Sequence, residues 1–233
     1  ELDLDLLGLL RVGVREHGLK QVGVQHQHLL ALALAASCTL QAQAIELNEQ
    51  FALAITPGLY SDYRNSGISQ TLGDPAAQLD LMLSHASGLY AGVWTSNVNF
   101  GYDWENDDRL GTRQEIDYYL GYYWQITDAI SLDGYYNHYT FPGEGQFNGS
   151  DIYLTLEAYG FFVGGKHSHD TDDSAFSQYA GYRTQLPLEI GLELRWENVD
   201  YKDGVFFNAD YSDSREDYDN WQVSLNRDLA GIT

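Results

Sequence analysis

The chain has 233 residues and a formal net charge of −22, because 34 Asp and Glu face only 12 Lys and Arg. Binding of nucleic acid through its phosphates requires clustered cationic side chains, so this charge excludes DNA and RNA as partners. Aromatic residues make up 14% of the chain, and Tyr and Trp rings concentrate at membrane interfaces. The length fits one large β-domain.

The first 44 residues predict upstream sequence followed by a secretory signal peptide. An apolar run at 29–40 is too short to span a bilayer, and Ala42 and Ala44 supply the small residues that precede a cleavage site after Ala44. The only cysteine, Cys38, lies in this segment, so the exported part, 45–233, would have no disulfide and no cysteine metal site. A lipoprotein signal at Cys38 is the alternative, but its usual leucine is missing.

Alternation of apolar and polar residues after residue 50 predicts ten β-strands. They are expected at 50–61, 76–86, 89–100, 113–125, 129–140, 150–158, 161–168, 175–185, 187–199 and 217–227. Connections after the even-numbered strands are tight, whereas those after the odd-numbered strands are long and polar. This rhythm predicts an all-β fold, an antiparallel up-and-down transmembrane β-barrel. A soluble sandwich with Greek-key connections is the alternative, although it would not keep this rhythm.

The two faces of the predicted strands differ sharply in polarity. Within 187–199, apolar residues at every second position alternate with Glu189, Glu193, Arg195 and Glu197. Charges on the lipid face of such a barrel cost about 2–4 kcal/mol each near the midplane, so we expect the charged parity to face a water-filled interior. Tyr90, Trp94, Tyr118, Tyr122, Tyr135 and Tyr136 are expected in the aromatic girdle at the membrane interface, with sugar stacking as the alternative.

The same parity argument defines the side chains that would line a pore. They are Arg64, Asp80, Glu115, Asp117, Asp133, Glu157, Arg183, Glu189, Glu193 and Arg195. Rings of carboxylates favour cations over anions, so the pattern predicts a cation preference. The alternative is that these charges pair across a narrow interior and form a polar core.

Four sequence blocks together resemble one bacterial family. The blocks are 61–70, 88–98, 115–117 and 139–143, and they resemble the TorF-type porin family, also catalogued as Gcw-type conserved outer-membrane proteins of Gram-negative bacteria. The resemblance covers most of 50–232 and implies an outer-membrane location. Two departures are Ser66, where the family usually has a second arginine, and the missing final aromatic residue after Thr233. We therefore expect a C-terminally incomplete chain with ten of twelve strands, lacking the signal that the outer-membrane assembly machinery reads.

Two other kinds of site are weaker hypotheses. His167 and His169 precede an acidic loop and share one strand face, which would suit a metal, but a solvated acidic turn explains the pattern better. His85 and His138 have Ser84 and Ser131 nearby, as a lipid-hydrolysing barrel would require. No nucleophile elbow is present in the sequence, so the chain is not expected to be an enzyme.

These observations predict an outer-membrane channel for passive diffusion of small hydrophilic solutes, with a preference for cations and without a cofactor. Its partners would be outer-membrane lipid and the diffusing solutes. One alternative is a plugged barrel with a structural or adhesive role. The other is a lipid-active barrel enzyme.

Overall fold

The computed structural model describes residues 8–9, 43–103, 108–109, 111–169, 175–206 and 214–227. This part of the chain is all-β, with strands joined by turns and by two short 3-10 segments, η1 (Gly145–Phe147) and η2 (Pro187–Glu189). None of its residues belong to a helix that is long and apolar enough to cross a membrane.

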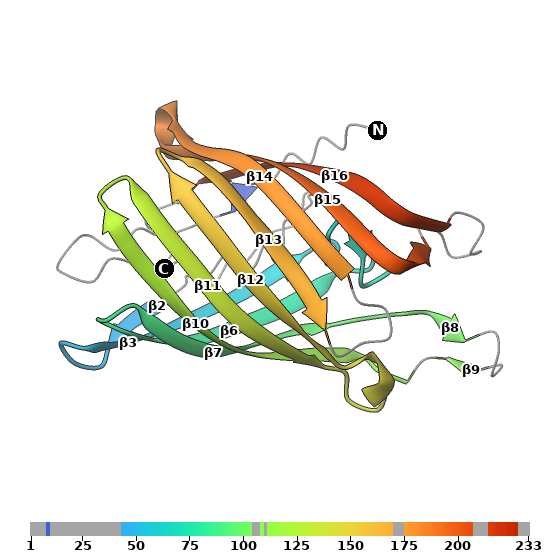
Figure 1. The fold of residues 1–233 in the computed structure, drawn as a ribbon. Coiled ribbons are helices and arrows are strands. Elements are labelled where there is room, and N and C mark those ends of the chain that lie inside the picture. Colours follow the sequence, from blue (N-terminus) through green and yellow to red (C-terminus); the bar gives the residue numbers. More distant parts are fainter. Residues whose placement is uncertain are drawn as a thin grey trace.

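One antiparallel sheet of eleven strands contains most of the described residues (Figure 1). Its strands, each paired with the next in this order, are β2 (Gln43–Glu46), β3 (Phe51–Tyr60), β6 (Ala76–His85), β7 (Leu89–Asn97), β10 (Gln114–Thr127), β11 (Ile130–Thr140), β12 (Gly149–Ala158), β13 (Phe161–His169), β14 (Ala175–Leu186), β15 (Ile190–Phe206) and β16 (Ser214–Arg227). A short strand, β1 (Gly8–Leu9), adds to β16 in parallel. The prediction of ten strands joined in chain order is confirmed, and β2 is an additional strand. Ala44, after which cleavage is predicted, lies within β2.

The sheet curls strongly about one interior. In Figure 1, β14, β15 and β16 lie across that interior from β3, β6 and β7. Among the described strands β1 and β2 are the two ends of the order, and they do not pair with each other. Two small hairpins lie outside the sheet, β4 (Arg64–Asn65) with β5 (Ile68–Ser69), and β8 (Tyr102–Asp103) with β9 (Asp108–Arg109).

The turn between β14 and β15 is longer than predicted. Pro187 has no amide hydrogen for a strand ladder, and Leu188 adopts φ +66°, so Pro187–Glu189 forms a 3-10 turn and β15 begins at Ile190. Glu189 was predicted to lie in a strand, and its place in this turn corrects that assignment, while its lining of the interior stays a prediction. At their other ends β15 and β16 extend into the predicted polar loop, because pairing resumes between Val205 and Arg215 after an irregularity.

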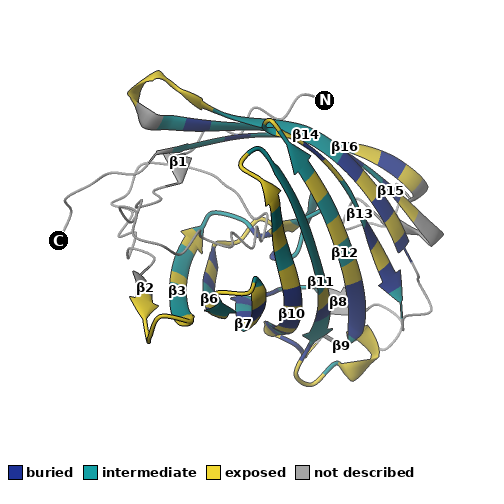
Figure 2. Cartoon of the chain, turned by 60° about the vertical axis from the view of Figure 1, so that its left-hand side comes forward, coloured by how far each residue is buried: buried dark blue, intermediate teal, exposed yellow. Residues whose placement is uncertain are grey.

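Alternation along the strands places apolar side chains on the convex face and charged ones inside (Figure 2). Leu120 and Leu154 are 54% and 55% exposed on the convex face. Glu115 and Asp151, on the same two strands but with the opposite parity, are 6% and 5% exposed. The predicted assignment of faces is therefore confirmed for these strands.

Aromatic side chains occupy much of the interior beside β6, β7 and β10. Tyr90 and Trp94 are almost fully buried in a cluster with Met82 and Tyr119. The ring of Tyr90 lies over Gly121 on the paired strand, where a Cβ atom would collide with it. The interior is thus partly filled by rings, whereas the sequence predicted water throughout.

Of the six residues predicted for an aromatic girdle, three face outward and three face inward, and the place of the outward three at a membrane interface stays a prediction. Tyr118, Tyr122 and Tyr136 are exposed on the convex face. Tyr90 and Trp94 point inward, as does Tyr135, which lines an internal cavity. Their parity explains the correction, because Tyr90 and Trp94 alternate with outward-facing Leu89 and Val93.

Candidate functional site

The connection between β3 and β6 folds across the interior instead of pointing away from it. At its tip the Ser66 hydroxyl donates a hydrogen bond of 3.0 Å to Glu197 Oε1 on β15. The Tyr218 hydroxyl on β16 donates to the Ser66 carbonyl at 3.0 Å. Gly67 has φ +84°, and a Cβ atom there would approach Asn220 Oδ1 to 2.9 Å, so this tip requires glycine. The β4–β5 hairpin is therefore held against the far wall.

Asp62 fixes the base of this hairpin. Its carboxylate accepts hydrogen bonds from Ser69 Oγ at 2.5 Å and from Thr71 Oγ1 at 2.8 Å. It also pairs with Arg64 Nε at 2.7 Å, and Arg64 donates to the Gly67 carbonyl as well. Arg64 was predicted to line the wall of the interior. It is instead an exposed residue of the hairpin that braces its own turn, because the connection that carries this hairpin does not continue the alternation of the main sheet.

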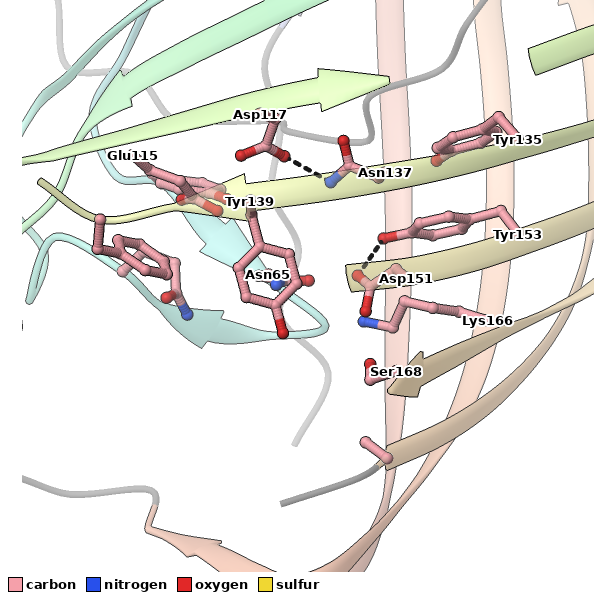
Figure 3. Close-up of a pocket in the computed structure, with 14 residues that line it drawn as sticks. Asn65, Glu115, Asp117, Tyr135, Asn137, Tyr139, Asp151, Tyr153, Lys166 and Ser168 are labelled. Carbon is pink, nitrogen blue, oxygen red and sulfur yellow. Dashed lines mark hydrogen bonds between the residues drawn. The ribbon is translucent and has the colours of Figure 1, made fainter. Parts of the chain in front are cut away.

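An internal cavity with a volume of about 180 Å³ lies beside the hairpin, toward the end of the sheet that carries the long loops (Figure 3). Three carboxylates line it, Glu115 and Asp117 from β10 and Asp151 from β12. Lys166 on β13 is the one basic side chain among the lining residues, and it points toward Asp151 in Figure 3. Lys166 also donates to the Ser66 hydroxyl at 3.5 Å, which links the cavity to the hairpin.

Hydrogen bonds orient the acidic side chains of the cavity. Asn137 Nδ2 donates to Asp117 Oδ2 at 2.8 Å, and the Tyr153 hydroxyl donates to Asp151 Oδ2 at 3.0 Å. The hairpin contributes Tyr63, where burial and the charge of Glu115 raise the pKa of the phenol well above its usual value. Tyr63 therefore remains a neutral phenol beside the carboxylates.

Phenol groups satisfy the acids in the middle of the interior. The Tyr119 hydroxyl donates to Asp80 Oδ1 at 2.6 Å, and the Tyr90 hydroxyl donates to Asp133 Oδ1 at 2.8 Å. Each pair joins two different strands. Asp80 and Asp133 therefore lie on the concave face, as predicted, but each is hydrogen-bonded to a tyrosine.

Arginines pair with Glu157 and Glu193 near the short turns and with Glu197 further along β15. Arg183 binds Glu157 at 2.5 Å and Glu193 at 2.7 Å, with its guanidinium 4.1 Å from the centre of the Phe162 ring. Arg195 lies 3.9 Å from the centre of the Tyr179 ring and 3.6 Å from Glu197. The alternative of internal pairing is therefore confirmed for these acids, whereas none of the described residues that line the cavity is an arginine.

Several cavity residues were missed although the sequence contains a signal for them. Outward-facing Ile152 and Leu154 fix the inward parity of Asp151 and Tyr153, and outward-facing Val163 does the same for Lys166. Parity also places Asn137 inside. Tyr63, Asn65 and Gln70 had no such signal, because they come from the connection between β3 and β6.

The geometry gives little support to the hypotheses of a catalytic site and of a metal site. His138 Nδ1 lies 3.0 Å from Ser150 Oγ, but Ser150 is 1% exposed and its hydroxyl already accepts a bond from Tyr136, so a lipid ester has no access to it. The rings of His167 and His169 are 6.5 Å apart. The adjacent acidic loop lies outside the described residues, and within them no three His, Cys, Asp or Glu side chains form a metal-binding group.

Fold and site together define an all-β protein with an apolar exterior and a charged, partly hollow interior. A family model described as "Bacterial protein of unknown function (Gcw_chp)" matches residues 45–232, and the chain belongs to this family. The predicted resemblance to Gcw-type proteins is confirmed, while the TorF porin relationship stays a prediction. No curated protein and no solved structure matches the chain.

Proposed function

We propose that the chain forms a β-barrel in the outer membrane of a Gram-negative bacterium and acts as a narrow channel for passive diffusion of small hydrophilic solutes, with a preference for cations. The eleven-stranded antiparallel sheet, with short turns at one end and long loops at the other, supports the barrel. That the sheet closes into a barrel is part of this proposal.

One observation carries the proposal: large apolar side chains face outward while ionisable side chains are buried. Leu120 and Leu154 are more than half exposed, whereas Glu115, Asp117 and Asp151 are buried. In a water-soluble protein leucine side chains are mostly buried, because removing apolar surface from water is favourable. Carboxylates are mostly exposed, because burying an unpaired charge is costly. Contact with acyl chains reverses the preference and explains this polarity.

The cation preference rests on the distribution of charge inside. Arginines neutralise Glu157, Glu193 and Glu197, but Glu115, Asp117 and Asp151 share one cavity in which Lys166 is the one basic side chain of the described lining. A solute that enters from the long-loop end therefore meets a surplus of carboxylates, which attracts cations and repels anions.

The test is a single-channel recording of the full chain refolded into planar phosphatidylcholine bilayers. We expect discrete conductance steps and, under a KCl gradient, a reversal potential with the sign of K⁺ selectivity. The variant Glu115→Gln should move this potential toward zero, while Asp74→Asn, which removes an exposed acid outside the cavity, should leave it unchanged. Chloride selectivity would overturn the proposed cation preference.

A plugged barrel with a structural or adhesive role is the second candidate, and the hairpin favours it. Ser66 and Tyr63 occupy space that an open pore would need, and the aromatic cluster around Tyr90 fills more of the interior. The same recordings separate the two candidates. Protein that is folded, as judged by heat-modifiable mobility in gel electrophoresis, but never conducts would replace the channel with the plugged barrel.

A further inference from the structure

We propose that the acidic cavity beside the β4–β5 hairpin is a binding site for a small organic cation that carries a guanidinium or primary ammonium group. The inference rests on the proposed function, because it names the class of solute that the interior would select. It is supported by unpartnered oxygen atoms, by the surplus of negative charge and by the contacts of Arg183 and Arg195 in the same interior.

Four buried oxygen atoms at the cavity have no hydrogen-bond partner within the described part of the chain. They are Glu115 Oε2, Asp117 Oδ1, Asn137 Oδ1 and Asp151 Oδ1. The four side chains are each at least nine-tenths buried. Asn137 donates its amide to Asp117, so the end left over is its acceptor oxygen. Buried acceptors without donors are costly, and a ligand rich in N–H groups would satisfy them.

These atoms lie close together because of strand register. Asn137 on β11 pairs directly with Asp151 on β12, and Asp117 lies on β10, the other neighbour of β11. Figure 3 shows Asp117, Asn137 and Asp151 around the same space, with Glu115 beside them. One ligand can therefore reach several of them at once.

Two of the protein's own arginines show which group binds to carboxylates beside an aromatic ring. The guanidinium of Arg183 lies between two carboxylates and over the Phe162 ring, and that of Arg195 lies beside Glu197 and over the Tyr179 ring. Carboxylates combined with an aromatic face hold a guanidinium by ion pairing and by the cation–π interaction. The cavity repeats this combination, and its described lining contains no arginine.

Aromatic walls and size favour an organic cation over a metal ion. Tyr135 and Tyr153 stack with their centres 4.3 Å apart and line the cavity together with Tyr63, Tyr139 and Phe141. A volume of about 180 Å³ exceeds the space that a bare metal ion occupies, and the described residues contain no metal-binding group. Phenol rings over a hollow of this size suit a flat guanidinium or an alkylammonium group.

Titration calorimetry on the full chain, folded in detergent micelles at fixed ionic strength, tests the site with agmatine as the probe. We expect saturable binding of one agmatine per chain, and we expect Asp117→Asn and Asp151→Asn each to weaken it about tenfold or more. The matched control is Asp74→Asn, an exposed acid outside the cavity, which should leave the dissociation constant unchanged. Absence of binding, an equal loss in the control, or displacement of agmatine by an equal concentration of K⁺ would each overturn the proposal.

A second pair of variants keeps the test decisive if the acid variants do not fold. Ser168 lines the cavity opposite Asp151 in the ladder, so Ser168→Arg would supply the missing guanidinium from the protein itself. We expect this variant to lose agmatine binding and to unfold at a higher urea concentration than the original chain. Ser168→Met fills similar space without charge and should lose binding with no such gain. A midpoint for Ser168→Arg no higher than that of Ser168→Met would overturn the proposal.

Failure of this inference is distinguishable from failure of the channel. Agmatine binding in micelles without conductance in bilayers would remove the channel and leave the site. Conductance without agmatine binding would remove the site and leave the channel.

Discussion

The hydroxyl of Ser66 donates a hydrogen bond to Glu197 across 131 residues of sequence, joining the tip of the β4–β5 hairpin to β15. Tyr218 holds the same residue through its carbonyl. Because these contacts fix a loop inside the curled sheet, the position of the hairpin controls how much of the interior is open. In the proposed channel the hairpin is the constriction.

Release of the hairpin should enlarge the conductance. The double variant Ser66→Ala, Tyr218→Phe removes three bonds from the tip, to Glu197, Lys166 and Tyr218, each contributing about 1 kcal/mol. We expect larger and noisier single-channel steps in planar bilayers. Tyr136→Phe removes a phenol that bonds Ser150 on the outer side, and it serves as the matched control with unchanged steps. Steps of the original size in the double variant would mean that the hairpin does not limit the pore.

Close packing between rings and glycines should make the interior sensitive to a single methyl group. A Cβ atom at Gly121 would collide with the Tyr90 ring, so we expect Gly121→Ala to lower the free energy of unfolding by about 1–3 kcal/mol. Gly134→Ala is the control, since its nearest neighbour is the end of the Leu154 side chain at 3.3 Å. Urea unfolding followed by tryptophan fluorescence measures both, and equal midpoints would contradict the packing argument.

Sequence periodicity predicted the strands and the faces of their acids because both depend on local alternation. The inward positions of Asp80, Glu115 and Asp117 follow from that parity alone. The same rule places Tyr90 and Asp151 inside, where both are buried, although the amphipathic character of tyrosine favours a membrane interface.

The remaining wrong predictions concern residues outside the regular strands of the main sheet, where alternation gives no information. Glu189 was assigned to a strand, although Pro187 interrupts the ladder just before it. Arg64 and Tyr63 belong to a loop whose path depends on contacts with distant strands, such as that between Ser66 and Glu197. The cavity is formed partly by this loop, so its shape was not accessible from the sequence.

Arg183 should be more important for stability than a surface arginine. It neutralises Glu157 and Glu193 together, and Arg183→Met would leave both carboxylates without their cation. We expect a loss of about 1.5–3 kcal/mol in the free energy of unfolding, measured in urea. Arg113→Met, at an exposed loop position, is the control and should change stability by less than about 0.5 kcal/mol. Adding Glu193→Gln to Arg183→Met should recover part of the loss, and no recovery would argue against charge as its cause.

The outward face can be tested directly for contact with lipid. Leu120 is the seventh residue of the fourteen-residue strand β10, so a barrel in a bilayer would hold it near the midplane. We expect Leu120→Arg to cost about 2–4 kcal/mol in phosphatidylcholine vesicles, because a guanidinium there must leave water. Leu89→Arg, at the turn end of β7, should cost about 0–1 kcal/mol, since that position lies near the interface. Urea unfolding from vesicles measures the difference, and equally small losses at the two positions would mean that this face meets water.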